Sequence, residues 1–276
     1  QFQSAHLSNS EQNLKFKKRS ILASLQILIK EASHYSDKAL EIYNSIGQVE
    51  FEEASNQLII NVLVVRLGYK IDKFFLQSYP NLQYILSPTT GLDHIDIRYC
   101  EKEGIRVISL NDIKKDIENV SSTAELTLGL IVSLIRKIPQ ASYSVLFDRK
   151  WDRDAFRTRQ LSNMSIGIIG VGRIGTMVAK YTNAMGMKVF GYDVEKDKKH
   201  FDDNNIQQLD LKDLLASSDI VSMHASSTPE NARLLNKQNL SFLNKGTYLI
   251  NTARGNLVCE ETIIELLDAN ILYGYA

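Results

Sequence analysis

The sequence predicts an α/β protein with two doubly wound parallel-sheet domains. Apolar, β-branched runs of strand length alternate with segments of helical periodicity along most of the chain. In the second half a glycine-rich turn, Gly170–Gly175, joins one such run to a helical segment. At 276 residues the chain is long enough for two domains. Since strands that alternate with helices favour a parallel sheet covered on both faces, we expect each half to form one layered domain.

The first half alternates strands and helices and is expected to form a domain over residues 19–112. The predicted strands are Leu25–Lys30, Gln48–Phe51, Leu58–Arg66, Leu82–Ser87 and Arg106–Ser109. The predicted helices are Ser36–Ile46 with Ser36 as its cap, Lys70–Ser78 ended by Pro80, and Asp93–Glu103 ended by Gly104. Residues 1–18 are polar, and we expect them to be disordered or loosely packed.

The second domain is expected to span residues 113–276 and to begin with a long helix. This helix, Ser121–Ile138, is apolar on most faces and is predicted to stop at Pro139, which suits packing between domains or subunits. The charged and aromatic segment Tyr143–Gln160 is predicted to be a surface loop. The predicted strands are Ser165–Gly170, Lys188–Tyr192, Ile220–Met223 and Thr247–Asn251, and further helices are Leu211–Ala216 and Glu261–Ala269.

The glycine turn carries the strongest functional signal of the chain. Gly170, Gly172 and Gly175 stand in G-x-G-x-x-G spacing between a predicted strand and helix, and Asp193 ends the next strand. Glycines there permit a tight turn, close approach of a pyrophosphate and close helix packing, while the carboxylate binds the ribose hydroxyls and repels a 2′-phosphate. The alternative is that the glycines serve β–α packing alone. Strand, glycines, helix, strand and acidic residue in this order favour NAD.

Composition excludes several other classes of function. Lys+Arg and Asp+Glu number 32 each, so no strong field for nucleic acid or an anionic membrane is expected. The chain has two cysteines, too few for a disulfide framework, which suits a reducing, cytoplasmic setting. We see no Cys/His spacing typical of a metal site, and no apolar run long enough to span a membrane.

Two residues at predicted strand ends are candidates for catalysis. Arg254 follows the strand Thr247–Asn251, and an arginine at that edge of the sheet can hold a carboxylate and polarise the neighbouring carbonyl. The alternative is a surface arginine beside a turn. His224 follows the strand Ile220–Met223 and is either a general acid or a residue that lines the cofactor pocket. Its chemistry alone does not decide between these roles.

The first half offers a second group of candidates, each with a structural alternative. Gly91 follows two threonines just before a predicted helix, where backbone N–H groups can meet a carboxylate. Asp93, His94 and Asp96 are better interpreted as the start of that helix than as a metal cluster. Arg66 ends a buried strand, and Asn119 precedes the long helix.

Taken together, these segments resemble the D-isomer-specific 2-hydroxyacid dehydrogenases, a family that includes 3-phosphoglycerate dehydrogenase. The matching segments run in family order and cover most of the chain from about residue 58 onward: SPTTGLDHID (87–96), NVSSTAELTLGLI (119–131), WDR (151–153), IGIIGVGRIG (166–175), VFGYD (189–193), MHASSTPENARLLN (223–236) and INTARGNLV (250–258). The resemblance implies two Rossmann-like domains, a flavodoxin-like substrate domain followed by the NAD-binding domain.

The resemblance also implies a role for each matching residue. It makes Arg254 the catalytic arginine and Asn119 an active-site residue, and it assigns substrate anchoring to Arg66, Thr90 and Gly91. The implied NAD-site residues are Gly170, Gly172, Arg173, Ile174, Gly175, Asp193, His224, Thr228, Thr252 and Ala253. It therefore places His224 beside the cofactor instead of at the proton transfer. The sequence HASST departs mildly from the family, where a proline is common in the middle.

The family's acid/base pair, a glutamate and a histidine, has no match among these residues, and the resemblance places it beyond Ala276. We therefore expect the chain to be a fragment that binds NAD(H) weakly and turns over poorly. The predicted activity of the parent protein is hydride transfer between NAD and a D-2-hydroxy acid, with a phosphoglycerate-like acid as one candidate. The predicted assembly is a homodimer formed through the helix at 121–138. The alternative is a non-catalytic NAD-binding regulator, similar to the family's corepressors.

Overall fold

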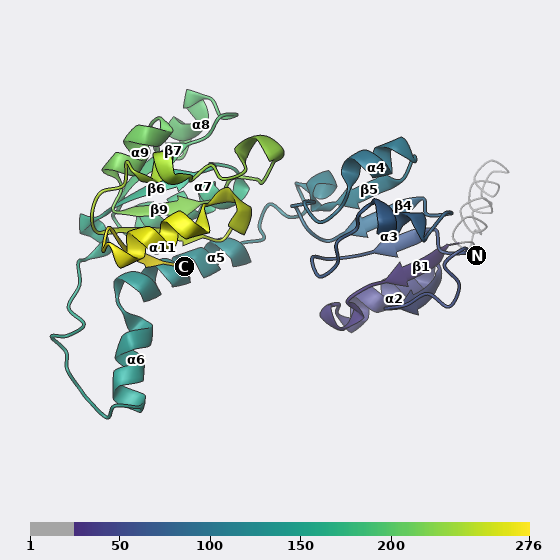
Figure 1. Ribbon diagram of the computed structural model, residues 1–276, viewed down its shortest axis with the longest axis horizontal. Helices are drawn as coiled ribbons and strands as arrows, with labels where there is room; N and C mark the ends of the chain where they lie inside the picture. Colours follow the sequence, from purple (N-terminus) through teal and green to yellow (C-terminus); the bar gives the residue numbers. More distant parts are fainter. Residues whose placement is uncertain (1–24) are drawn as a thin grey trace, which may run out of the picture. The chain divides into compact units, whose positions relative to one another are not determined.

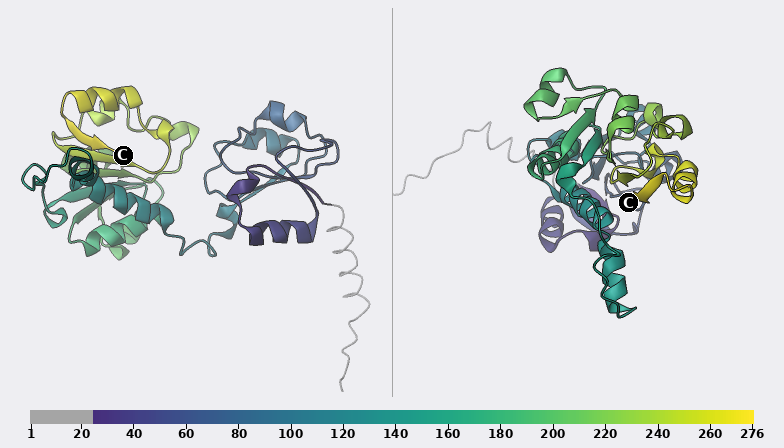
Figure 2. Two further views of the ribbon diagram at one scale, coloured as in Figure 1. Left: turned by 90° about the horizontal axis from the view of Figure 1, so that it is seen from below. Right: turned by 90° about the vertical axis from the view of Figure 1, so that its left-hand side faces the viewer.

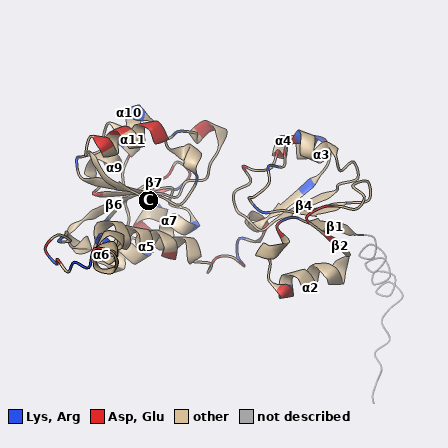
Figure 3. Cartoon of the chain, turned by 60° about the horizontal axis from the view of Figure 1, so that its bottom comes forward, with Lys and Arg blue, Asp and Glu red and all other residues tan. Residues whose placement is uncertain are grey.

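A computed structural model describes residues 25–276, which fold into two compact units (Figure 1). The first unit ends at Ile117 and the second spans Glu118–Ala276, whereas the sequence places the boundary between residues 112 and 113. Each unit has its own parallel sheet, as predicted. Acidic and basic residues occur on both units (Figure 3). Among the described residues, no helix combines the length and apolar character needed to cross a bilayer.

The first unit has a five-stranded sheet in the order β2-β1-β3-β4-β5. Its strands are β1 (Gln26–Ile29), β2 (Gln48–Phe51), β3 (Val62–Val64), β4 (Tyr84–Ser87) and β5 (Arg106–Ser109). The helices are α2 (Asp37–Ile46), α3 (Lys73–Gln77) and α4 (Ile97–Lys102), with the short 3-10 helices η1 (Ala32–His34) and η2 (Leu110–Ile113). The central strands β1 and β3 are almost wholly buried, because helices and loops cover both faces of the sheet.

Five predicted elements of this unit are shorter than the sequence suggests, and three of them lose four residues or more. The strands β1 and β4 each lose two residues. The run Leu58–Arg66 contributes only β3, since Leu58 and Ile59 form an exposed turn before the sheet begins. The helix α3 begins at Lys73, where the Asp72 side chain accepts a hydrogen bond from the N–H of Phe75. The helix α4 begins at Ile97 instead of Asp93, because Asp96 is its cap and the preceding residues form a turn.

The second unit has a six-stranded parallel sheet in the order β11-β10-β9-β6-β7-β8. Its strands are β6 (Ser165–Ile169), β7 (Lys188–Tyr192), β8 (Gln207–Gln208), β9 (Ile220–Met223), β10 (Thr247–Asn251) and β11 (Leu272–Tyr275). The chain begins in the middle at β6, moves outward to β8, and then crosses back to β9 on the other side. The switch point therefore lies between β6 and β9, where doubly wound sheets bind their ligands.

Helices cover both faces of this second sheet (Figure 2). One core cluster joins residues of α5 and α7 to the strands, and another joins residues of α9, α10 and α11 to the opposite face. The helices are α5 (Ser122–Ile135), α6 (Ile138–Leu146), α7 (Arg173–Ala184), α8 (Lys198–Asp203), α9 (Leu211–Ser217), α10 (Lys237–Leu240) and α11 (Glu260–Asp268), with 3-10 helices η3 (Leu161–Asn163), η4 (Pro229–Asn231) and η5 (Gly255–Leu257).

The prediction of one helix over Ser121–Ile138 is wrong at its end. The helix is interrupted at Lys137, whose backbone adopts a left-handed conformation. Pro139 then lies in the first turn of a second helix, α6. Proline is favoured there because the first helical turn has no N–H partner to lose. The predicted loop at Tyr143–Gln160 is therefore helical at its beginning, up to Leu146.

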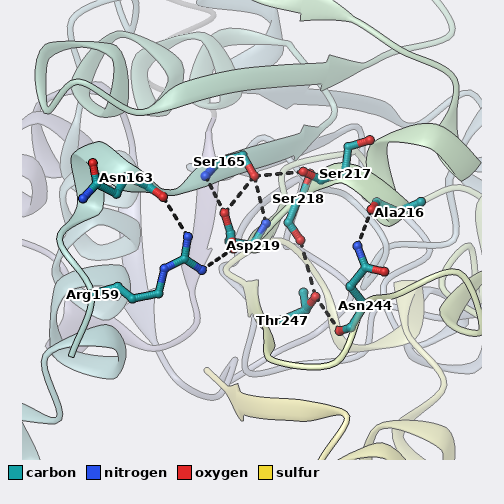
Figure 4. Close-up of polar contacts among 9 residues, drawn as sticks. All are labelled: Arg159, Asn163, Ser165, Ala216, Ser217, Ser218, Asp219, Asn244 and Thr247. Carbon is teal, nitrogen blue, oxygen red and sulfur yellow. Dashed lines mark hydrogen bonds and ion pairs between the residues drawn. The ribbon is translucent and has the colours of Figure 1, made fainter. Parts of the chain in front are cut away.

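A polar network secures the amino ends of the central strands, opposite the edge where the glycine turn lies (Figure 4). The Asp219 carboxylate accepts hydrogen bonds from the N–H and hydroxyl of Ser165, at 2.8 and 3.0 Å, and from Arg159. Burial raises the pKa of the Asp219 carboxyl, but these hydrogen bonds outweigh it and lower the pKa below its ordinary value. Asp219 is therefore an ionised structural anchor between β6 and β9.

Candidate dinucleotide site

The three glycines of the turn have different surroundings. Gly170 follows β6 at φ 89°, and a Cβ there would lie 2.4 Å from the backbone nitrogen of Ala225. A Cβ on Gly175 would lie 2.1 Å from the carbonyl oxygen of Gly170. At Gly172 no heavy atom lies within 4 Å of a Cβ position. The fold thus requires glycine at the first and third positions. At the second position the space is open, as close approach of a ligand requires. We call the open turn Gly170–Gly175 the glycine cradle.

The cradle opens onto the amino end of α7. Gly172 is the N-cap of this helix, and among the described residues no side chain caps it and no acidic residue lies in its first turn. The first N–H groups of a helix lack partners within it and carry a partial positive charge. This helix end can therefore accept the phosphates of a dinucleotide through the backbone of Arg173 and Ile174. The Arg173 side chain itself donates to the carbonyl oxygen of Val120.

Asp193 stands at the end of β7, the strand next to the glycine turn. One carboxylate oxygen accepts the N–H of Val171 at 2.7 Å, and the other accepts the N–H of Glu195 at 2.8 Å. Each carboxylate oxygen has two acceptor sites, so the half-buried side chain keeps capacity for two hydroxyl donors. The backbone contacts hold the carboxylate at the end of β7, the place where dinucleotide-binding folds carry the acidic residue for the ribose.

A cavity of about 250 Å³ connects these features within the second unit. It lies at the carboxyl ends of β6, β7 and β9, at the switch point of the sheet. Its lining residues are Ile169, Gly170, Gly172, Tyr192, Asp193, Val194, Glu195, His224, Ala225, Ser226, Thr228, Asn231 and Leu234. Five residues of the sequence-predicted cofactor set line it: Gly170, Gly172, Asp193, His224 and Thr228. The other five, Arg173, Ile174, Gly175, Thr252 and Ala253, lie outside its lining.

His224 lies beside this cavity in a constrained position. Its backbone N–H donates to the carbonyl oxygen of Ile169 at 2.7 Å, and its Nε2 lies 2.8 Å from the hydroxyl of Ser222. Burial lowers the pKa of the imidazole to about 4. The ring is therefore neutral at pH 7, which favours the lining role over proton donation.

Arg254 lies at the carboxyl end of β10 on a loop held by Asn251. The Asn251 side chain accepts the N–H of Ala253 at 3.1 Å and donates to the carbonyl oxygen of Arg254 at 2.9 Å. The half-buried guanidinium donates to the Ala253 carbonyl at 2.9 Å. The loop thus carries a cation at the same carboxyl edge of the sheet as the glycine cradle, as the sequence position of Arg254 predicts.

Sequence reasoning missed two residues that support this loop. Asn251 lies in the NTARG segment, but its side-chain bonds appear only in the structure. Thr127, a buried residue of α5, lies with its hydroxyl 2.9 Å from that of Thr252. Asn119, the other predicted catalytic residue, is exposed just before α5. Its neighbour Val120 is the residue that Arg173 contacts.

The three predicted substrate residues lie in the first unit. Arg66 follows β3, its N–H donates to a Glu31 carboxylate oxygen at 2.9 Å, and its guanidinium donates to the carbonyl oxygen of His34 at 3.1 Å. The carbonyl oxygens of Thr90 and Gly91 accept side-chain hydrogen bonds at 2.7 and 2.8 Å, respectively. The expectation that Gly91 immediately precedes a helix is wrong, because the next helix, α4, begins only at Ile97.

The sequence of the second unit decides the family. Residues 128–276, just over half of the chain, match the family described as D-isomer specific 2-hydroxyacid dehydrogenase, NAD binding domain. The chain belongs to this family. The glycine cradle, the free helix end and Asp193 are the features that an NAD-binding domain needs, so the family assignment and the geometry agree.

Curated relatives of the family are similar over most of this chain. A D-3-phosphoglycerate dehydrogenase of Methanocaldococcus jannaschii is 31% identical over 251 residues, which cover 88% of this chain and 46% of the relative. A hydroxypyruvate reductase of Thermotoga maritima is 32% identical over 215 residues, covering 78% of this chain and 67% of the relative. The chain thus spans about half the length of several curated relatives it matches.

Two solved structures of other proteins share this fold. A D-lactate dehydrogenase from Aquifex aeolicus, complexed with NAD and lactic acid, superimposes with a TM-score of 0.80 at 27% identity, covering 90% of this chain and 75% of that chain. An acyclic imino acid reductase in complex with NADPH and D-Arg superimposes with a TM-score of 0.78 at 25% identity, covering 91% of this chain and 81% of that chain.

Proposed function

We propose that the protein is an NAD-dependent oxidoreductase that acts on the CH–OH group of a D-2-hydroxy acid. The observation that carries the proposal is the mounting of Arg254 at the same carboxyl edge of one sheet as the glycine cradle and Asp193. Binding of a dinucleotide needs only the cradle and the carboxylate. A cation held at the sheet edge adds the group that a carboxylate substrate needs, which favours an enzyme over a non-catalytic regulator.

Different residues of the chain are proposed to bind the substrate and to stabilise charge in the reaction. When NAD is bound in the glycine cradle, its nicotinamide would supply the hydride chemistry at C2 of the substrate. Arg254 holds the substrate carboxylate with two parallel N–H donors and stabilises negative charge on the C2 oxygen. Asn119 donates a further hydrogen bond to the substrate. Since His224 is neutral at pH 7, we assign proton transfer to a group other than His224.

The proposal names a class of substrates and leaves the individual compound open. The relatives are named for phosphoglycerate, hydroxypyruvate and lactate. These acids share a carboxylate next to a carbon, C2, that carries a hydroxyl or carbonyl oxygen. Arg254 fits this shared feature. The substrate-anchoring role that the sequence implies for Arg66, Thr90 and Gly91 stays a prediction. The experiment below determines the side chain of the acid.

Titration with NADH and NADPH, followed by a panel of 2-oxo acids, tests the proposed function. We expect NADH to bind with a gain in its fluorescence and NADPH to bind at least about tenfold more weakly, because Asp193 repels the 2′-phosphate. The panel contains pyruvate, glyoxylate, hydroxypyruvate and phosphohydroxypyruvate, assayed with the whole protein for NADH oxidation and for a D-product. NADH binding without oxidation of NADH by any acid would support the regulatory alternative, and absence of NADH binding would refute both.

We further propose that the protein forms a homodimer through the face made by α5, α6 and the segment that follows α6. Large apolar side chains are exposed there, among them Leu126, Tyr143, Leu146, Phe147 and Trp151, with Trp151 85% exposed. Contiguous exposed apolar side chains mark protein interfaces. A second copy is the expected partner because the helix predicted at Ser121–Ile138 resembles the family's dimer element.

The double substitution Leu146→Glu with Phe147→Glu is expected to convert the dimer into a monomer. Two buried carboxylates at an apolar interface cost more than the association gains. Light scattering after size-exclusion chromatography measures the mass. Ile42→Glu, at an equally exposed apolar residue of α2, is the matched control and should leave the mass unchanged. A monomeric wild-type protein at micromolar concentration would contradict the proposal.

A further inference from the structure

The peptide groups on both sides of Val171, in the middle of the glycine turn, are held by side chains from outside the turn. The N–H of Val171 donates to Asp193 at 2.7 Å. Its carbonyl oxygen lies 2.9 Å from Nε2 of His200, and the Thr176 hydroxyl donates to the same oxygen at 3.3 Å. Val171 is itself fully buried. The turn is therefore held by three side chains. Asp193 already belongs to the dinucleotide site, and Thr176 belongs to α7, with its hydroxyl 3.4 Å from Nε2 of His200. The third, His200, does not line that site.

His200 is the donor in its contact with the turn. A backbone carbonyl only accepts hydrogen bonds, so Nε2 must carry the proton in this contact. The residue is firmly mounted within α8. Asp197 caps its backbone N–H at 2.9 Å, Asn204 donates to its carbonyl oxygen at 2.8 Å, and the next residue, Phe201, is fully buried in the core. His200 can therefore hold the Val171 carbonyl in a single direction.

The direction of that carbonyl determines the direction of the next N–H. The described residues contain no cis peptide bond, and in a trans peptide the C=O and the following N–H point to opposite sides. The N–H of Gly172 therefore faces away from His200. Gly172 lines the cavity and His200 does not. The hydrogen bond from His200 thus turns this peptide so that its donor faces away from α8, at the start of the helix end that receives phosphates.

We propose that His200 is a positioning residue for the pyrophosphate of the dinucleotide, acting through the Val171–Gly172 peptide. The inference rests on the proposed dinucleotide site and adds a residue that the site's own lining does not contain. The hydrogen bond from His200 is expected to affect the binding free energy of the pyrophosphate and not that of the adenosine. Adenosine uses the Asp193 side of the cavity and carries no phosphate, whereas ADP-ribose and NADH also need the turn and the end of α7.

Two substitutions at His200 separate the hydrogen bond from the packing of the ring. His200→Leu removes the donor, and His200→Gln restores an N–H at a similar distance from the backbone. Asp202→Asn, on the exposed side of the same helix, is the matched control. ADP-ribose affinity is measured by calorimetry and adenosine affinity by ligand-observed NMR, with the melting temperature of each variant recorded alongside.

His200→Leu is expected to bind ADP-ribose about fivefold more weakly, the effect of one lost neutral hydrogen bond, while adenosine affinity stays unchanged. His200→Gln should recover most of the loss, and Asp202→Asn should behave as wild type. Equal ADP-ribose affinity in His200→Leu and wild type would overturn the inference, as would a parallel loss of adenosine binding. A wild-type chain that binds neither ligand would instead overturn the proposed dinucleotide site.

Discussion

Replacing Gly175 with alanine is expected to abolish NADH binding and to destabilise the second unit by about 2 kcal/mol or more, the cost of overpacking against a rigid neighbour. The added Cβ would lie 2.1 Å from the carbonyl oxygen of Gly170, a backbone atom that cannot rotate away. The helix α7 must then shift from β6, and the cradle between them opens. Denaturant unfolding measures the stability, and NADH fluorescence titration measures the affinity.

Two other glycine substitutions serve as controls for this result. Gly129→Ala, in α5, places a Cβ in open space, so stability should hold or rise by up to about 1 kcal/mol, with NADH affinity unchanged. Gly172→Ala also meets no protein atom, so the unit should stay folded while NADH binds more weakly. If Gly175→Ala bound NADH as wild type does, the helix–strand contact would not be what shapes the cradle.

Replacing Arg254 with lysine in the whole protein is expected to lower kcat/KM for the 2-oxo acid by about 10²–10³-fold, the effect of losing an aligned transition-state donor. Lysine keeps the charge but lacks the planar pair of donors that grips a carboxylate. NADH affinity should remain unchanged, because Arg254 does not line the dinucleotide cavity. Steady-state kinetics and NADH titration separate the two effects.

The matched control for Arg254 is Arg233→Lys, at an exposed arginine whose partner is Glu261 on the surface. It should leave kcat/KM unchanged. Wild-type turnover in Arg254→Lys would show that the reaction does not need the guanidinium and would contradict the proposed role of Arg254. A loss of NADH affinity equal to the loss in kcat/KM would instead show that Arg254 acts on the cofactor.

Most of the fold was predictable because it depends on local patterns. The strands β6, β7, β9 and β10 follow apolar, β-branched runs, and the glycine spacing marks the turn that links β6 to α7. Errors occurred where an apolar run continues beyond an element. Leu58 and Ile59 are apolar yet exposed, and α5 ends before Ile138 because Lys137 takes a left-handed conformation. Hydropathy and proline position do not show where such a run leaves its sheet or helix.

The sequence indicated the candidate residues that follow strands, but not the side chains that reach the site from other elements. The glycines, Asp193 and Arg254 can be recognised in the sequence because each stands near a strand end in a known spacing. Residues that act from other elements give no such signal. Thr127 is one threonine in an apolar helix, and His200 is one histidine in a charged segment, yet they contact Thr252 and Val171, respectively.

The family, the fold class and the NAD-type turn could be inferred from the sequence, because they follow from the order and spacing of residues near one another in the chain. Three properties became visible only in the folded chain: which glycine is open to a ligand, the burial that lowers the pKa of His224, and the contact of His200 with the turn. These properties depend on contacts between segments distant in sequence. The distances and burial that set them arise only when the sheet brings its carboxyl ends together.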